Sequence, residues 1–425
     1  MLSSLLTSAD AMWQKEIYLK GFAGISPKVN IDFARLEEAA AGVMRPEAFA
    51  YVAGGAGRES TMRNNRDAFE KYKIVPRMLR DVGERDTSIT LFGRKLPTPF
   101  LLSPIGVLEM VHKEADVAVA RVAAQFGVPY IFSNQASRPM EACAEVMHQS
   151  PRWFQLYWSK SNELVASFVR RAEQCGCSAI VVTLDTTLLG WRTRDLELAY
   201  LPFLEGKGIA QYTSDPVFQK MLDLPDDAPD MKRHVTLRTL QGLVSMVNHY
   251  PGSGFLKKLL SGKPVKAVRT FVSTYSNPCT TWEDLAFLRS CTKLPIVLKG
   301  ILHPDDALKA IDHGMDGILI SNHGGRQVDG AIGTLQALPA IAAVVNKKIP
   351  ILLDSGIRGG ADAFKALALG ATAVCIGRPY VYGLALAGEE GVTEVLNNFM
   401  ADFDLTLGLS GCRSVAELSA QNLVT

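Results

Sequence analysis

The sequence predicts an α/β protein built as a (β/α)8 barrel, the TIM-barrel fold. From about residue 99 onward, eight short apolar runs alternate with amphipathic stretches of helical spacing. The runs are nearly continuous in Val, Ile, Leu and Phe, as parallel strands covered on both faces require. Nearly every run also carries a polar residue at or near its end. A doubly wound open sheet could use the same alternation, but the count of eight and the polar strand ends favour the barrel.

The eight apolar runs are the predicted strands of this barrel. Between them, stretches such as EADVAVARVAAQFG and NELVASFVRRAEQCG have helical spacing and end in glycine, which often terminates helices. In chain order the strand runs are PFLLSPIG (99–106), PYIFSN (129–134), WFQLYW (153–158), AIVVTLD (179–185), PIVLKG (295–300), GILISNHG (317–324), PILLDSG (350–356) and AVCIGRP (373–379).

Two segments lie outside this repeat, although we expect residues 1–425 to form a single domain. Residues 1–95 form an N-terminal segment, with helices expected in IDFARLEEAAAGVM and RPEAFAYVAGG and a β-like stretch in TSITLFGRKLPTP. The barrel occupies residues 96–425, and residues 195–280 within it form a long insertion after the fourth strand. That insertion leaves the C-terminal face, where barrel active sites lie, so we expect a partly helical and partly mobile lid. An insertion with no role in the site is the alternative.

Composition and termini restrict the class of protein and its compartment. The chain is 48% hydrophobic and 21% charged, and its net charge of +2 implies neither nucleic acid nor a membrane as a partner. No apolar run is long enough to cross a membrane, and neither terminus carries a secretory, mitochondrial or peroxisomal signal. Seven cysteines indicate free thiols in a reducing compartment, and we expect no metal site. We therefore expect a cytoplasmic protein.

Polar and ionisable residues gather at the predicted strand ends. In a barrel these ends meet around one mouth. Ionisable groups are rare in a core, and an ordinary surface would not align them with the strand ends. This concentration indicates a functional site. The residues are Gly106, Ser133, Gln135, Gln155, Tyr157, Thr183, Asp185, Arg192, Lys299, His323, Arg326, Asp354, Arg358, Gly377 and Arg378.

The loops after the seventh and eighth strands read DSGIRGG and GRP. Barrels commonly bind phosphate between these two loops, because glycine lets the ligand approach backbone N–H groups. Arg358 and Arg378 would add charge-assisted hydrogen bonds. Either arginine alone could be a solvated loop residue, but together they favour a phosphate-bearing cofactor.

The stretch SNHGGRQVDG (321–330) places a histidine and an arginine at the end of the sixth strand. His323 has a side chain suited to act as a base near neutral pH, and Asp185 could orient it and stabilise its imidazolium. Arg326 and Arg192 suit a carboxylate substrate. A loop histidine with no catalytic role is the alternative for His323.

The motifs SNHGGRQ, LKG, DSGIR and GRP together resemble the FMN-dependent α-hydroxy-acid oxidising family, over about residues 17–418. Within that family, AYVAGGAGRESTMRNN, FQLYW, TLDTTLLGWRTRDL and SDPVFQK are most similar to lactate 2-monooxygenase. The resemblance implies FMN as cofactor, a small L-2-hydroxy acid as substrate and oxygen as acceptor. It also implies a homo-oligomer, a tetramer or an octamer.

The resemblance assigns roles to individual residues. His323 would accept a proton as the hydroxy acid is oxidised, and Lys299 would lie by flavin N1 and the C2 oxygen, where negative charge develops. The substrate would be held by Tyr51, Tyr157, Arg192 and Arg326. The expected FMN-binding residues are Pro104, Ile105, Gly106, Ser133, Gln155, Thr183, Lys299, Ser321, Asp354, Ser355, Gly356, Arg358, Gly377 and Arg378.

Two positions bear on the reaction outcome and the substrate. The resemblance implies that oxidases carry alanine at Gly106 and monooxygenase relatives glycine, so this chain is expected to retain its keto acid and decarboxylate it. Release of keto acid and hydrogen peroxide, as in a plain oxidase, is the alternative. Gln135 stands where relatives have an aromatic residue or leucine, which indicates a substrate with another hydrogen-bonding group. The lid is also longer than in those relatives, mainly around NHYPGSGFLKKLLSGKPVKAVRTF.

Two other classes of function compete with this interpretation. Lys299 ends a strand and could form a Schiff base in an aldolase, but that leaves SNHGGRQ unexplained. The chain could also be a flavin-binding scaffold without catalysis. The complete set of candidate catalytic residues argues against a scaffold.

Overall fold

Eight parallel strands close into a barrel in the computed structural model, which describes residues 9–224 and 236–425. Strand order around the barrel follows the chain, and the last strand pairs with the first. Each strand coincides with one of the predicted runs, so the predicted fold class is confirmed. The strands are β4 (Phe100–Leu102), β5 (Tyr130–Phe132), β6 (Arg152–Leu156), β7 (Ile180–Thr183), β8 (Ile296–Ile301), β9 (Gly317–Ile320), β10 (Ile351–Leu353) and β11 (Ala373–Ile376).

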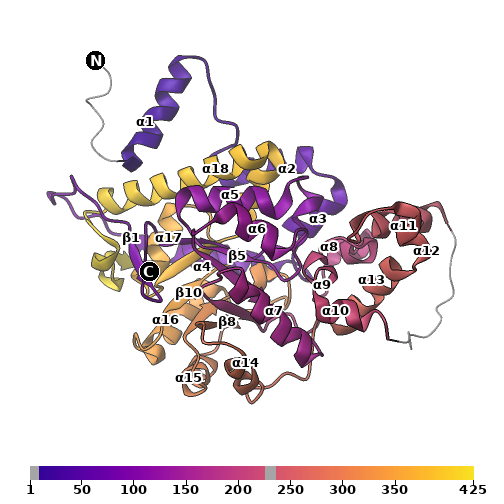
Figure 1. Ribbon diagram of the computed structural model, residues 1–425. Coiled ribbons are helices and arrows are strands. Elements are labelled where there is room, and N and C mark those ends of the chain that lie inside the picture. The colour runs from indigo at the N-terminus through magenta and orange to yellow at the C-terminus, as the bar shows by residue number, and fades with distance from the viewer. Residues whose placement is uncertain (1–8, 225–235) are drawn as a thin grey trace.

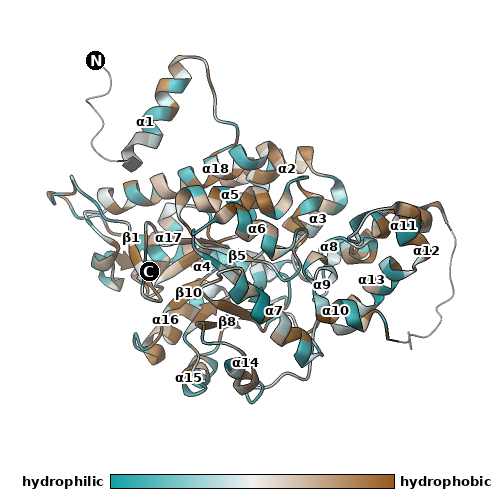
Figure 2. Cartoon of the chain, in the orientation of Figure 1, coloured by the Kyte–Doolittle hydropathy of each residue, from teal (hydrophilic) through white to brown (hydrophobic). Residues whose placement is uncertain are grey.

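Helices surround the barrel, as expected of a sheet buried on both faces. The strands are wholly buried except for Gly300 in β8, and the brown of β8 in Figure 2 shows how apolar they are. The long α18 is interrupted at Ala387 and Gly388, where the backbone leaves the helical conformation. The surrounding helices are α5 (Ala115–Phe126), α6 (Met140–Met147), α7 (Asn162–Gln174), α14 (Leu285–Cys291), α15 (Pro304–Asp312), α16 (Thr334–Val345), α17 (Gly360–Ala368) and α18 (Arg378–Leu409).

A hairpin from the N-terminal segment closes the bottom of the barrel. It consists of β2 (Ile89–Leu91) and β3 (Arg94–Leu96), as the β-like stretch predicted. Its apolar residues join the cluster that fills the barrel interior, and the ring of Phe92 lies 5.6 Å from that of Trp153. With this end sealed by apolar side chains, the polar strand ends are left at the opposite mouth.

The helices of the N-terminal segment are α1 (Ala9–Phe22), α2 (Phe33–Val43), α3 (Pro46–Ala53) and α4 (Ser60–Lys71). The predicted helices correspond to α2 and α3, whereas α4 was not predicted because its sequence is mostly polar. Helix α4 packs against η3 (His323–Gly325), so this segment reaches the barrel mouth. A short strand pair, β1 (Lys73–Ile74) with β12 (Leu423–Val424), joins the two ends of the fold. The start of the chain, on which the targeting expectation rests, lies outside the described residues.

The insertion after β7 forms a helical lid, as the sequence predicts, and its later helices extend to one side of the barrel in Figure 1. The expectation of partial mobility falls in part on residues 225–235, which lie outside the described part of the chain. Among the described residues, no helix has both the length and the apolar character needed to span a membrane. The lid elements are α8 (Thr193–Glu197), η2 (Pro202–Glu205), α9 (Ala210–Thr213), α10 (Pro216–Met221), α11 (Leu237–His249), α12 (Phe255–Leu260) and α13 (Lys263–Thr274).

Candidate active site

A cavity opens at the C-terminal mouth of the barrel, between the strand ends, the N-terminal segment and the lid. Most of the predicted site residues line it, although they come from widely separated parts of the chain. The lid contributes a wall of apolar and aromatic side chains that the sequence did not single out, among them Phe203, Phe271 and Tyr275. The predicted residues that line the cavity are Tyr51, Pro104, Ile105, Gly106, Gln135, Tyr157, Arg192, Lys299, His323, Arg326, Asp354, Ser355, Gly356, Arg358, Gly377 and Arg378.

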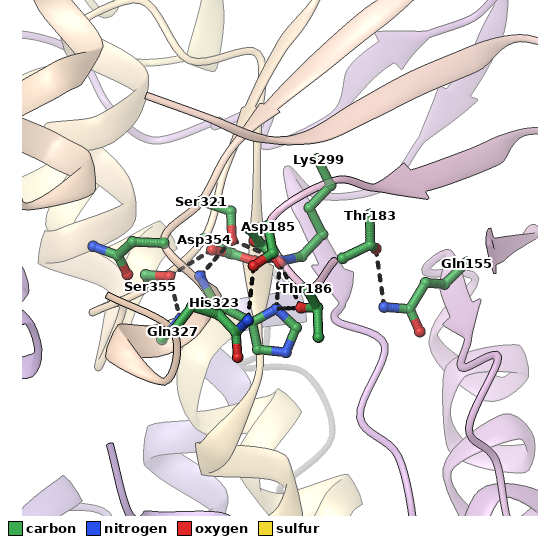
Figure 3. A network of polar contacts seen from close by, with 12 residues as sticks. Gln155, Thr183, Asp185, Thr186, Lys299, Ser321, His323, Gln327, Asp354 and Ser355 are labelled. Atoms are coloured by element: carbon green, nitrogen blue, oxygen red, sulfur yellow. Dashed lines mark hydrogen bonds and ion pairs between the residues drawn. The ribbon is translucent and has the colours of Figure 1, made fainter. Parts of the chain in front are cut away.

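His323 and Asp185 form a hydrogen-bonded pair at the cavity wall (Figure 3). The Nδ1 atom of His323 lies 2.7 Å from Oδ1 of Asp185, and the hydroxyl of Thr186 lies 3.1 Å from the same nitrogen. Burial lowers the pKa of His323, although the negative charge of Asp185 opposes that effect. The neutral ring therefore donates from Nδ1 to Asp185, which leaves Nε2 able to accept a proton. Sequence reasoning found this pair but missed Thr186.

The backbone around His323 is held in an unusual conformation. His323 has φ of +57°, in the left-handed region that residues other than glycine rarely adopt. The hydroxyl of Ser321 accepts the N–H of His323 at 3.1 Å, and that of Ser355 accepts the N–H of Gly324 at 2.9 Å. Two hydroxyl groups thus fix the orientation of the candidate base.

A buried amide pair braces the same loop from below. Asn322 Nδ2 donates to Oδ1 of Asn65 at 2.7 Å, and Asn65 Nδ2 donates to Oδ1 of Asn322 at 2.9 Å. Asn65 also accepts the N–H of Thr334, so α4 is joined to the loop and to α16. The sequence did not reveal Asn65, because nothing in STMRNN shows which asparagine faces the barrel.

Lys299 is a buried cation at the bottom of the cavity. Strand β8 has a bulge at Gly300, which aims Lys299 inward from the strand end. Its Nζ lies 2.7 Å from Ser321 Oγ, 3.4 Å from Asp185 Oδ2 and 3.5 Å from Asp354 Oδ2. Burial works against the charge, but the two carboxylates more than offset it and raise the pKa of Lys299. Asp185 is also buried, yet Lys299 and His323 hold its pKa below the usual range.

Arg192 and Arg326 converge on the cavity, as predicted. The guanidinium of Arg326 lies 4.9 Å from the ring centre of Tyr51 and donates to backbone carbonyls of the N-terminal segment. Burial, together with the nearby charge of Arg192, lowers the pKa of Arg326 to about 9. A carboxylate ligand would relieve this repulsion. Burial and the charge of Asp185 raise the pKa of Tyr157 to about 12, so its hydroxyl keeps its proton.

The other end of the cavity is also cationic. Arg378 donates to the carbonyls of Val52 at 2.9 Å and of Gly324 and Gly54 at 3.0 Å, and so joins the N-terminal segment to the His323 loop. The guanidinium of Arg358 lies 3.9 Å from the ring centre of Phe33. Burial and then the charge of Arg378 lower the pKa of Arg358 to about 9. Both guanidiniums lie deep in the protein yet open onto the cavity.

Five of the predicted site residues do not line the cavity. Asp185 and Ser321 lie behind it, bonded to His323 and Lys299 as described above. Ser133, Gln155 and Thr183 form a hydrogen-bonded chain across β5, β6 and β7, with 3.2 Å from Ser133 Oγ to Gln155 Oε1 and 3.0 Å from Gln155 Nε2 to Thr183 Oγ1. Figure 3 shows the Gln155–Thr183 contact beside Lys299.

The residues present fit FMN. A Cβ built on Gly377 would lie 3.6 Å from Ile105 Cδ1 and 3.8 Å from Ser103 Cβ, so the missing side chain leaves free volume in the cavity. The nearby arginine pair suits a phosphate, and the buried ammonium of Lys299 suits a group that gains negative charge. Acid–base chemistry on a carboxylate, beside a phosphate-bearing cofactor, is what this cavity can support. The fold and this cavity together are those of a barrel enzyme that holds a phosphate-bearing cofactor.

Comparisons with known proteins give the family. The model of the FMN-dependent dehydrogenase family matches residues 40–425, and the chain belongs to that family. It is 44% identical over 409 residues to an L-lactate oxidase of Lysinibacillus sphaericus, covering 96% of each chain. It is 40% identical to an FMN-dependent α-hydroxy acid dehydrogenase of Penicillium citrinum, covering 92% of this chain and 90% of the relative.

A solved structure is also similar to this chain along most of its length. The structure of mandelate oxidase with (S)-4-hydroxymandelic acid superposes with a TM-score of 0.75 at 36% identity, covering 93% of this chain and 98% of the other. The protein is thus an FMN-dependent oxidoreductase that acts on α-hydroxy acids.

Proposed function

We propose that this protein oxidises a small L-2-hydroxy acid to the 2-keto acid with oxygen as the electron acceptor, and keeps the keto acid bound for decarboxylation. The observation that carries the oxidation is the pair of His323 and Asp185, 2.7 Å apart, facing the converging guanidiniums of Arg192 and Arg326. A candidate base and two arginines suited to a carboxylate line one cavity, and this supports the proposal.

The substrate is held by its carboxylate. Arg192 and Arg326 supply the two charges, and the hydroxyls of Tyr51 and Tyr157 contribute hydrogen bonds to the carboxylate and the α-hydroxyl. His323 accepts a proton at Nε2 as the α-carbon is oxidised, and Asp185 stabilises the imidazolium that results. FMN, when bound, would supply the two-electron acceptor for this oxidation. The lid side chains exclude water from this end of the cavity.

FMN binding is divided between the two ends of the cavity. Arg358 and Arg378, with the backbone at Gly356 and Gly377, hold the phosphate. Lys299 would face the part of the flavin that gains negative charge. The flavin ring would be held by Pro104, Ile105 and Gly106, which line the cavity, and by the chain of Ser133, Gln155 and Thr183. Ser321 and Asp354 contact Lys299, and Ser355 bonds to Asp354, so these three residues would orient Lys299 and the ribityl chain.

Gly106 and Gln135 are the residues proposed to keep the keto acid bound until it is decarboxylated. A Cβ built on Gly106 would lie 3.0 Å from the carbonyl oxygen of Gln135 and 3.1 Å from its Cβ, so the Gln135 loop packs closer than an alanine permits without a shift. A keto acid retained in this tight corner meets the peroxide formed at the flavin. The reaction is then R–CO–COOH + H2O2 → R–COOH + CO2 + H2O.

The Gly106→Ala variant tests this proposal. We expect its ratio of hydrogen peroxide to carbon dioxide to rise at least severalfold over the parent, in air and with the same hydroxy acid. Anaerobic bleaching of the flavin should be retained, because Gly106 does not take part in proton transfer. An unchanged ratio in a variant that still bleaches would remove the support for keto-acid retention.

A plain oxidase, which releases keto acid and peroxide, is the second candidate, favoured by the L-lactate oxidase of Lysinibacillus sphaericus. Carbon dioxide at background level in the parent would establish it. A flavin-binding scaffold without catalysis would instead stay yellow with every 2-hydroxy acid tried. We also expect a cytoplasmic homo-oligomer, a tetramer or an octamer, which light scattering can measure.

A further inference from the structure

One carboxylate joins the lid to the loop that carries Gly106. Glu109 lies in η1 (Leu108–Met110), three residues after Gly106. Its Oε1 accepts the N–H of Gly208 at 3.0 Å, and its Oε2 lies 2.9 Å from Nε2 of His249. The side chain of Glu109 is only 13% exposed and that of His249 29%, so water screens this contact less than it would a fully exposed ion pair.

The hydrogen bonds of His249 show its charge. Its Nδ1 lies 2.7 Å from the carbonyl oxygen of Ser245, which can only accept, so Nδ1 must carry a hydrogen. Nε2 faces the carboxylate of Glu109, which also accepts and therefore requires a hydrogen on that nitrogen as well. The ring is thus an imidazolium in this conformation. The hydrogen bond that His249 donates to Glu109 raises the pKa of His249, against the effects of burial and of the nearby charge of Lys207.

Helix packing connects the contact between Glu109 and His249 to the wall of the cavity. Helix α11, which ends at His249, packs against η2 and α13, the elements that supply Phe203 and Phe271 to the cavity wall. Next to the ion pair, the backbone at Gly208 packs directly against the loops that carry Val107 and Gln135. A Cβ there would be 2.6 Å from Val107 Cγ2 and 3.1 Å from the carbonyl oxygen of Gln135, so only glycine permits this approach.

We propose that Glu109 and His249 are positioning residues whose ion pair keeps the lid closed on the Gly106 loop and thereby prolongs retention of the keto acid. Lid closure follows from the contacts alone. The effect on product retention rests on the proposed function. Neither residue touches the reacting atoms, and both act through the position of the lid.

The proposal implies a dependence on pH. Because the pKa of His249 is raised by its partner, the ion pair is complete below the ordinary histidine pKa and is lost as the pH rises through the raised value. The neutral ring keeps its hydrogen on Nδ1, so Nε2 turns a lone pair toward Glu109. The other charged groups beside the ring are Lys207 and its own partner Glu205, whose carboxylate lies 2.7 Å from Lys207 Nζ. Burial opposes the charge of Lys207, but the hydrogen bond to Glu205 raises its pKa, so Lys207 keeps its charge over this range.

Hydrogen exchange of the FMN-bound protein tests closure without reference to the reaction. Exchange is followed by mass spectrometry from pH 6 to 9, corrected for intrinsic rates, in the parent, His249→Gln and Glu109→Gln. Lys263→Gln is the matched control, because it breaks another lid ion pair, with Asp223 at 2.9 Å, away from the cavity. In the parent and the control, protection of residues 202–210 and 237–249 should fall as the pH rises. In the two test variants it should be low at every pH.

Product analysis over the same pH range tests retention. We expect the ratio of peroxide to carbon dioxide in the parent to rise roughly threefold to fivefold with pH, the range expected for one partly exposed ion pair. The ratio in His249→Gln should be high and independent of pH. Protection that does not change with pH, or that is equal in the parent and His249→Gln, would overturn lid closure by this pair. If the hydrogen-exchange protection changes but the ratio of peroxide to carbon dioxide does not, only the role in keto-acid retention is overturned. Failure of the proposed function itself is recognised separately, by an unchanged product ratio in Gly106→Ala.

Discussion

Asp185 affects the pKa of the candidate base, His323, and accepts a hydrogen bond that orients its ring. Its carboxylate raises the pKa of His323 against the effect of burial, so replacing Asp185 by Asn should lower that pKa further. His323 must be neutral to accept a proton, and the acidic limb of kcat/KM in the parent should lie below about pH 6.5. Asp185→Asn should shift this limb to lower pH and reduce kcat by about 100-fold or more, because the imidazolium loses its stabilising charge. A pH profile of kcat/KM that matches the parent would contradict this role.

Asn65 should act on catalysis only through the loop it holds. In Asn65→Ala, the buried amide of Asn322 loses its partner and the left-handed conformation of His323 loses its support. We expect kcat to fall at least tenfold with little change in KM, measured by oxygen uptake, while the visible spectrum still shows bound FMN. Asn64→Ala is the control, since the side chain of Asn64 donates to Ala331 O rather than to Asn322. An equal loss in both variants would indicate general destabilisation instead.

The bulge in β8 is the element that brings Lys299 between its two carboxylates. Gly300 has φ of +109°, and a Cβ there would lie 3.0 Å from Asp185 Cβ. Gly300→Ala should lower the free energy of unfolding by about 1–3 kcal/mol and slow anaerobic flavin reduction, because both Lys299 and Asp185 must shift. Gly314→Ala is matched in backbone conformation, with φ of +70°, but has free space around its Cβ. Urea denaturation of the two variants measures the cost of backbone strain, and stopped-flow absorbance measures the effect of displacing Lys299 and Asp185. Equal rates of flavin reduction in Gly300→Ala and Gly314→Ala would contradict a role for the bulge in positioning Lys299.

Among the secondary-structure elements, the barrel strands could be predicted from the sequence, whereas helix α4 and the apolar wall of the lid could not. Each strand is a continuous apolar run, so eight strands and their polar ends could be predicted from local pattern. Helix α4 could not be predicted, because its sequence is mostly polar and the contact of its buried Asn65 with Asn322 forms only in the folded chain. The lid wall of Phe203, Phe271 and Tyr275 was missed for the same reason. Its residues meet only in the folded chain.

For the molecule as a whole, FMN should contribute substantially to stability. Without an anion, Arg358 and Arg378 repel each other in the interior, and Arg326 lies near Arg192. Adding FMN to the cofactor-free protein at 100 times its Kd should stabilise the fold by about 2.7 kcal/mol and raise Tm by about 3 °C, measured by calorimetry. In Arg358→Leu the increase in Tm should be smaller at the same FMN concentration. An identical increase would place the phosphate elsewhere.

The cavity is built from three separate parts of the described chain. The barrel supplies the candidate base and the lysine, the N-terminal segment supplies Tyr51 and the carbonyls that hold Arg326 and Arg378, and the lid supplies the apolar wall. Most of the site residues predicted in the barrel and the N-terminal segment line this one cavity. Their roles in binding and catalysis remain predictions that single substitutions can test.

The proposed function depends above all on His323 acting as the base for oxidation of a 2-hydroxy acid. The most direct test mixes FMN-loaded parent and His323→Ala with L-lactate without oxygen and follows the flavin absorbance by stopped flow. We expect the parent to bleach and the variant to bind FMN normally but to bleach at least 100-fold more slowly. Bleaching of the variant at the parent rate would show that another group removes the proton and would contradict the account.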